Sequence, residues 1–232
     1  MGKHGRPDIL DRWEETCNDL MKAHDDHYEA LAANIKTLQR LEQAGLVPSP
    51  GFERYIAEGE RQLHVLTAQC RAAGLAGELV ARLHKTLRDA DMAEIELIRT
   101  TRELAHMREK QQACERALVE DAYNQERAHE RGGPSFCHKP LTNKRRKQVE
   151  TSLKLLEGKV DLRWQHRLAM ELVEECQQAV QMLLMGTMQA VAQAHDLGIS
   201  RNLGVGIPPQ RVRELLGIAE EHPDRLSLIE LE

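Results

Sequence analysis

The chain has 232 residues, enough for one large domain or two small ones, and its formal net charge at pH 7 is −5. Hydrophobic residues make up 41% of the chain and aromatic residues only 3%, while Ala, Leu, Glu, Gln and Arg dominate, a usage typical of long helices. The sequence lacks strand-forming runs, and no apolar run follows its first basic residues, so neither a β-rich fold nor a secretory signal peptide is expected.

A first helix is predicted at residues 7–44, because apolar residues recur there at alternating spacings of four and three and Gly45 is placed to end it. The apolar residues are Cys17, Met21, His24, Tyr28, Leu31, Ile35 and Leu38. A second helix is predicted at 50–73, capped by Ser49 and stopped near Gly74.

A third helix is predicted at residues 75–131, ending at the break formed by Gly132, Gly133 and Pro134. A fourth is predicted at 143–197. The remaining residues, 199–232, are expected to form a short helix and a tail without clear periodicity.

The fourth helix carries the longest apolar stripe of the chain, and the other helices are expected to cover it. In its first half the spacings of four, three and four place these residues on one helix face: Val149, Leu153, Leu156 and Val160. Past Trp164 and Leu168 the phase shifts, which indicates a stutter or a bend. The segment Ala179–Ala192 is apolar nearly all round and is predicted to be buried on all sides, but it is too short to span a membrane.

The simplest packing lays the two longest helices antiparallel and stacks the first two along them. We therefore predict an all-α fold: an elongated antiparallel helical bundle with coiled-coil character over residues 1–198, followed by the C-terminal segment 199–232.

The five cysteines are an odd number, lie far apart and form no Cys-x-x-Cys pair. This pattern favours free thiols in a reducing compartment over disulfides or a zinc site. We expect a soluble cytoplasmic protein with no metal and no other cofactor.

The only strong charge feature is a basic segment between residues 132 and 149, which holds no acidic residue. Its basic residues are Lys139, Lys144, Arg145, Arg146 and Lys147. Most of them lie at a predicted helix N-terminus, where the helix dipole disfavours cations, so something is expected to offset them. The candidates are acidic residues near the end of the third helix, or nucleic-acid phosphate, or an acidic protein partner.

The motif Glu-x-x-His occurs twice, at Glu103/His106 and Glu126/His129. Such pairs can hold iron in helical bundles, where they come from different helices. Here both copies fall on one predicted helix, about 35 Å apart, so they are expected to be ordinary solvated side chains.

Three other features are expected to be structural. His24 lies on the apolar face of the first helix and is interpreted as a core histidine. Residues 3–7 contain Gly-Arg-Pro, as in a minor-groove hook, but the flanking basic residues are few. The glycines of Gly198–Gly206 follow a helix rather than a strand, so they predict a flexible connector and not a phosphate loop.

Uniform helix periodicity without a convergent polar cluster favours a non-enzymatic interaction or scaffold protein that assembles with itself or with protein partners. The alternative is a nucleic-acid-associated regulator that binds phosphate through the basic turn at 139–147. A helical-bundle enzyme is the third hypothesis, because such enzymes normally carry paired acidic or histidine ligands that face one core. No membrane partner is expected.

Overall fold

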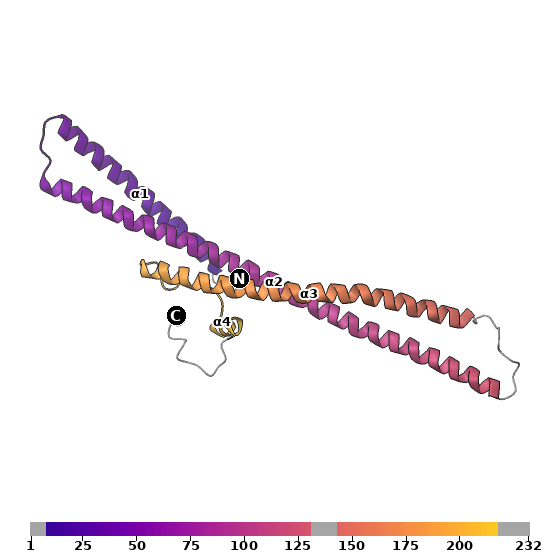
Figure 1. Cartoon of the computed structure of the whole chain (residues 1–232). Helices are drawn as coiled ribbons and strands as arrows, with labels where there is room; N and C mark the ends of the chain where they lie inside the picture. The colour runs from indigo at the N-terminus through magenta and orange to yellow at the C-terminus, as the bar shows by residue number, and fades with distance from the viewer. Residues whose placement is uncertain (1–7, 131–142, 218–232) are drawn as a thin grey trace, which may run out of the picture. The chain divides into compact units, whose positions relative to one another are not determined.

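The computed structural model describes residues 8–130 and 143–217. Over these residues it contains four helices and no strand (Figure 1). The helices are α1 (Ile9–Gln43), α2 (Pro50–Glu130), α3 (Asn143–Asp196) and α4 (Pro209–Leu216). Helix α1 packs beside α2, and α2 packs beside α3, each pair antiparallel. The prediction of an all-α fold built from long antiparallel helices is therefore confirmed.

Local chemistry sets the helix ends close to where the sequence predicts them. At the start of α1, a carboxylate oxygen of Asp11 accepts a hydrogen bond from the backbone N–H of Asp8 at 3.3 Å. After α1, Gly45 has a φ of +72°, the left-handed conformation that ends many helices. Before α2, the backbone N–H of Phe52 donates to the hydroxyl of Ser49 at 3.3 Å. The predicted stop at Gly45 and cap at Ser49 are confirmed.

The predicted stop near Gly74 is wrong, because α2 continues through it without a break. A glycine inside a helix costs only about 1 kcal/mol relative to alanine. On either side of Gly74, Ala73 and Ala76 are completely buried. One turn further, a Cβ added to Gly77 would lie 3.5 Å from the Cβ of Trp13 on α1. Burial of this small-residue face offsets the local cost, so the two predicted helices are one.

The chain divides into two compact units, each described by itself. Unit 1 comprises Met1–Arg88 and Gln177–Glu232, and unit 2 comprises Asp89–Cys176. Helices α2 and α3 each contribute a segment to both units.

The core of unit 1 is made by one face each of α1, α2 and α3 together with the loop that follows α3. It contains Trp13, Ala73, Ala76, Val80, Ala190, Val191, Ala194, Ile199 and Leu203. The alanines let helices approach closely, and Trp13, only 1% exposed, fills the remaining space. The apolar spacing of the sequence did not single out Trp13.

The loop after α3 is held in place by side chains that bond its backbone carbonyls. In each bond a side-chain nitrogen of the first residue donates to the backbone carbonyl of the second. The pairs are Arg12 and Asn202 (2.7 Å), Trp13 and Gly204 (3.0 Å), Gln69 and Leu197 (2.7 Å), His84 and Val205 (2.9 Å), and His195 and Leu203 (2.7 Å). Two of its own side chains, Ile199 and Leu203, are buried in the core of unit 1. The prediction of a flexible connector is wrong, because these bonds fix the loop to three helices.

The expectation that Ala179–Ala192 is buried on all sides is also wrong. Val180 and Leu184 are buried, but Met182 is 76% and Met185 59% exposed. Met182 and Met185 lie on the side of α3 opposite to the buried Val180 and Leu184, so this helix buries one face and exposes the other. Over the described residues, no helix has an apolar window long enough to cross a membrane.

Candidate interaction surface

The contact between α2 and α3 in unit 2 includes several polar interactions. The ammonium of Lys159 donates to Gln111 Oε1 at 2.6 Å. The hydroxyl of Thr101 and Nε2 of His166 share a hydrogen bond of 3.1 Å. Near the start of α3, the thiol of Cys114 bonds a backbone carbonyl at 3.6 Å. These directional bonds accompany apolar packing, because Leu162, Ala169 and Val173 of α3 are also buried in unit 2.

The face of α3 that packs against α2 in unit 2 follows one helical spacing. Its buried or half-buried residues are Gln148, Ser152, Leu155, Lys159, Leu162, His166, Ala169, Val173 and Cys176. A Cβ added to Gly158 would lie 3.1 Å from Cε of Met107, so the two helices come close there.

A second face of α3 in unit 2 is apolar and points to solvent. We name it the outer stripe, and it comprises Val149, Leu153, Leu156, Val160 and Trp164. Each of these side chains is between 39% and 65% exposed. The expectation that the other helices cover this stripe is wrong, because the phase of α3 in unit 2 follows Leu162, Ala169 and Val173, which are buried on the other face.

The two edges of the outer stripe carry different polar residues. At 100° per residue, Glu150 and Glu157 fall on one edge of the stripe. Ser152 and Lys159 fall on the opposite edge, together with Arg145. The stripe thus has one edge with two glutamates, of which Glu150 lies 3.9 Å from Arg146, and an opposite edge without acidic residues.

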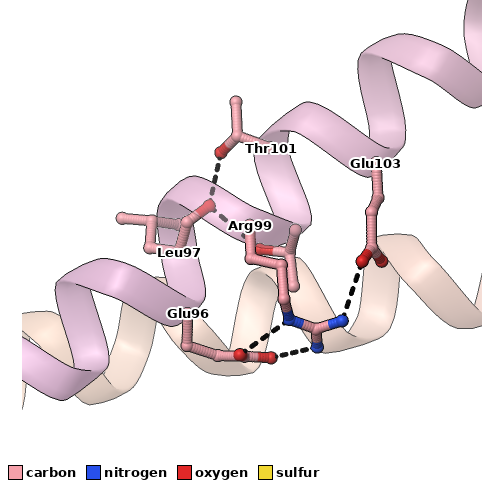
Figure 2. A network of polar contacts seen from close by, with 6 residues as sticks. Glu96, Leu97, Arg99, Thr101 and Glu103 are labelled. Carbon is pink, nitrogen blue, oxygen red and sulfur yellow. Dashed lines mark hydrogen bonds and ion pairs between the residues drawn. The ribbon is translucent and has the colours of Figure 1, made fainter.

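The exposed side of α2 in unit 2 carries a charge network (Figure 2). Arg99 donates from Nε to Glu96 at 2.9 Å and from Nη1 to Glu103 at 2.8 Å, and Nη2 also bonds Glu96. The hydrogen bond from Arg99 is the main cause that lowers the pKa of Glu96, and that same bond is the main cause that raises the pKa of Arg99. All three residues lie on α2 at spacings of three and four, so these ion pairs stabilise the helix itself and do not join it to another element.

The basic residues predicted as a binding site do not form one described patch. Lys139 lies outside the described residues, and Lys144 lies in the first turn of α3. Arg145 is half-buried, whereas Arg146 and Lys147 are exposed. Because consecutive helical residues are about 100° apart, these three spread over about 200° of the helix surface. Arg146 lies 3.9 Å from Glu150 on the same helix, so part of its charge is offset within α3.

The Glu-x-x-His motif at Glu103/His106 does not form a metal site in this structure. Glu103 binds Arg99, and His106 lies 3.9 Å from the exposed carboxylate of Glu109. Within residues 8–130 and 143–217, no three His, Cys, Asp or Glu side chains gather as metal ligands would. In the second copy of the motif, the side chain of His129 lies outside the described part of the structure.

The histidines of α1 have structural partners. Nδ1 of His24 lies 3.1 Å from a carboxylate oxygen of Asp25, and its side chain is only partly buried. His27 donates from Nε2 to the backbone carbonyl of Gly59 at 2.9 Å, which ties α1 to α2. The minor-groove-like residues 3–7 lie outside the described residues.

Four cysteines are free, as the sequence predicts, and they are half-buried: Cys17, Cys70, Cys114 and Cys176. Burial raises the pKa of Cys17, and the neighbouring Cys70 raises it further. The pKa of Cys70 is raised by burial and then by Asp25. A raised pKa keeps a thiol protonated and unreactive, which suits a packing role in unit 1.

No family model, curated protein or solved structure matches this chain.

Proposed function

We propose that this protein is a non-enzymatic helical interaction protein that assembles with itself or with protein partners through the outer stripe of α3. The observation that carries the proposal is the arrangement of polarity in unit 2. There, apolar side chains of α3 face solvent in a continuous row, although the contact with α2 buries a separate face on which apolar residues alternate with polar ones such as Lys159 and His166. Exposed apolar residues scattered singly are ordinary, whereas a contiguous row marks an interaction site.

The free energy gained by burying the outer stripe would favour association. Burying a large apolar side chain is worth about 1.5–3 kcal/mol, and the outer stripe offers a row of such side chains. Its aromatic residue, Trp164, is 62% exposed and belongs to a residue type enriched among energetically dominant interface positions. We place the assembly in the cytoplasm, where free thiols stay reduced.

The test compares the full-length protein with the double variant Leu153→Gln/Leu156→Gln. We expect the variant to keep its helix content, because both side chains are exposed, and to lose association, either with itself or with proteins that the wild type retains specifically. The control is Met92→Gln/Ile95→Gln, which changes two exposed apolar residues of α2 in the same unit. If association is the same in all three proteins, the outer stripe is not the interaction surface.

The nucleic-acid alternative is tested by titration of duplex DNA and RNA at about 50 and 200 mM salt. The variant for this test replaces Lys144, Arg145, Arg146 and Lys147 with Gln. On the interaction-protein proposal, wild type and variant bind alike and weakly. Steeply salt-dependent binding by the wild type that the variant loses would favour the phosphate-binding alternative instead, because phosphate contacts release counterions.

A further inference from the structure

We propose that the occupant of the outer stripe is a second copy of this chain, aligned parallel to the first, so that the two α3 helices form a short parallel coiled coil. This inference rests on the proposed function and adds the identity and direction of the partner. It follows from the spacing of the stripe, from the charges on its two edges and from the position of Trp164.

The spacing of the stripe is that of a coiled-coil seam. Val149, Leu153, Leu156 and Val160 alternate at four, three and four residues, so they occupy successive core positions of a heptad repeat. In this register Leu153 and Val160 take position a, and Val149 and Leu156 take position d. In a parallel two-fold pair each of these residues meets its own copy, whereas in an antiparallel two-fold pair each position a meets a position d of the partner, and both arrangements are self-complementary.

The edges of the stripe decide the direction of the second copy. In an antiparallel pair, identical edges lie beside one another, so Glu150 of one copy would lie beside Glu157 of the other, and symmetry would repeat this repulsion. In a parallel pair, each acidic edge lies beside the opposite edge, where the flanking position before Leu153 is Ser152 and the one before Val160 is Lys159. The parallel arrangement therefore removes the like-charge contact.

Trp164, at the end of the seam, also favours the parallel arrangement. In a parallel pair the flanking position of Lys159 lies beside the next flanking position of the partner helix, which is Trp164. A lysine ammonium over an indole ring is attracted to it. Lys159 donates one N–H to Gln111 of its own chain. Because an ammonium has three N–H donors, this bond is compatible with a contact between Lys159 and Trp164 of the second copy.

The fold within each copy does not compete with this pairing. The contact of α3 with α2 is centred on a different face, which includes Leu155, Leu162 and Ala169, and it meets the outer stripe only at the edge that carries Ser152 and Lys159. The second copy therefore adds to the intrachain packing of unit 2 and replaces none of it.

The first experiment measures molar mass against concentration for the full-length protein, up to about 100 µM, a concentration well above the Kd of micromolar complexes. We expect a dimer for the wild type and for Met92→Gln/Ile95→Gln, and a monomer for Leu153→Gln/Leu156→Gln. A wild type that stays monomeric overturns the second-copy proposal. If that monomeric chain still captures another protein through the stripe, the proposed function survives. A dimer that persists in the stripe variant overturns the assignment of the surface itself.

The second experiment tests direction with Glu150→Lys. In the parallel pair the introduced lysine would lie at the edge that carries Arg145, so we expect the dimer Kd to rise by roughly three- to tenfold, since each exposed pair counts twice. In an antiparallel pair the lysine would lie beside Glu157, and the dimer would tighten. The matched control is Glu109→Lys, a charge reversal on α2 at a side chain that is 79% exposed, compared with 63% for Glu150. Tightening by Glu150→Lys but not by the control overturns the parallel arrangement.

A third outcome concerns the chain's own C-terminal residues. If the wild type is monomeric and a zero-length cross-linker joins Lys154 to a carboxylate within residues 218–232 of the same chain, the stripe is covered from within. That result also overturns the second-copy proposal.

Discussion

Unit 1 and unit 2 are built from the same kind of antiparallel helix, and two of their helices are shared, but they bury apolar side chains differently. In unit 1, Trp13, Val80, Leu83, Leu184 and Val191 are at most 1% exposed. In the described part of unit 2, the one side chain buried to that degree is a polar residue, Thr100. Several large apolar residues of α3 in unit 2 are instead about half exposed.

The two units differ in how many elements pack around their apolar side chains. In unit 1, three helices and a loop surround the core, so large side chains that face it, such as Trp13 and Leu184, are fully covered, while Met182 and Met185 on the far side of α3 stay exposed. In unit 2, the described residues supply two helices, and two helices cover only one stripe on each other. A second apolar face on α3 is then left for a partner, and the contrast between the units is the physical basis of the proposed function.

The two tryptophans test this contrast with the largest expected effect. Trp13→Ala removes a side chain that is 1% exposed and should lower the free energy of unfolding by about 3–5 kcal/mol. Trp164→Ala removes one that is 62% exposed and should cost under about 0.5 kcal/mol in the monomer. Denaturant unfolding followed by circular dichroism, at a concentration below the dimer Kd, measures both. Equal losses would mean that the two units are packed alike.

Two glycines sharpen the contrast in backbone packing. Gly206→Ala in unit 1 places a Cβ 2.9 Å from the Cβ of Ile9 at a φ of +74°, so a loss of about 1–3 kcal/mol is expected. Gly158→Ala in unit 2 meets only the flexible end of Met107, and alanine favours helix. We expect that variant to lie between unchanged stability and a gain of about 1 kcal/mol. A large loss at Gly158 would show that unit 2 is as tightly packed as unit 1.

The thiol of Cys17 reports on the packing of unit 1. Because burial raises its pKa, less thiolate is present near pH 8, and alkylation should be slower than for an unstructured cysteine peptide. Trp13→Ala should speed the reaction by loosening the neighbourhood. Mass spectrometry of the alkylated peptide follows the rate. Peptide-like reactivity in the wild type would contradict the packing seen around Cys17.

The smallest effect concerns the polar surface of unit 2. Arg99 lowers the pKa of Glu96, so the midpoint of the Glu96 carboxyl in an NMR titration should lie below the ordinary glutamate value of about 4.3. Because the folded-state pKa is the lower one, the stabilisation is present above the unfolded-state pKa and is lost as pH falls through the folded-state pKa. Arg99→Gln should return the midpoint towards the ordinary value. An unchanged midpoint would remove Arg99 as the cause.

Side-chain spacing predicted much of the outline but chose some wrong faces. On α1 it selected Met21 and Tyr28, which are more than half exposed, and it did not select Trp13. On α3 it predicted burial all round Ala179–Ala192, where Leu184 is fully buried but Met182 and Met185 are exposed. A helix with several apolar residues can have more than one possible apolar face. Which face is buried depends on where the adjacent helix packs.

The sequence by itself determined the all-α fold, the long helices and most of their ends, because these depend on interactions within a few residues. The stop at Gly45, the cap at Ser49 and the opening of α4 at Pro209 are of this kind. The tertiary structure decided that α2 runs through Gly74, that the loop after α3 is fixed, and that the outer stripe faces solvent. Each of these depends on contacts between residues far apart in the chain, and the local pattern carries no information about which neighbour will be present.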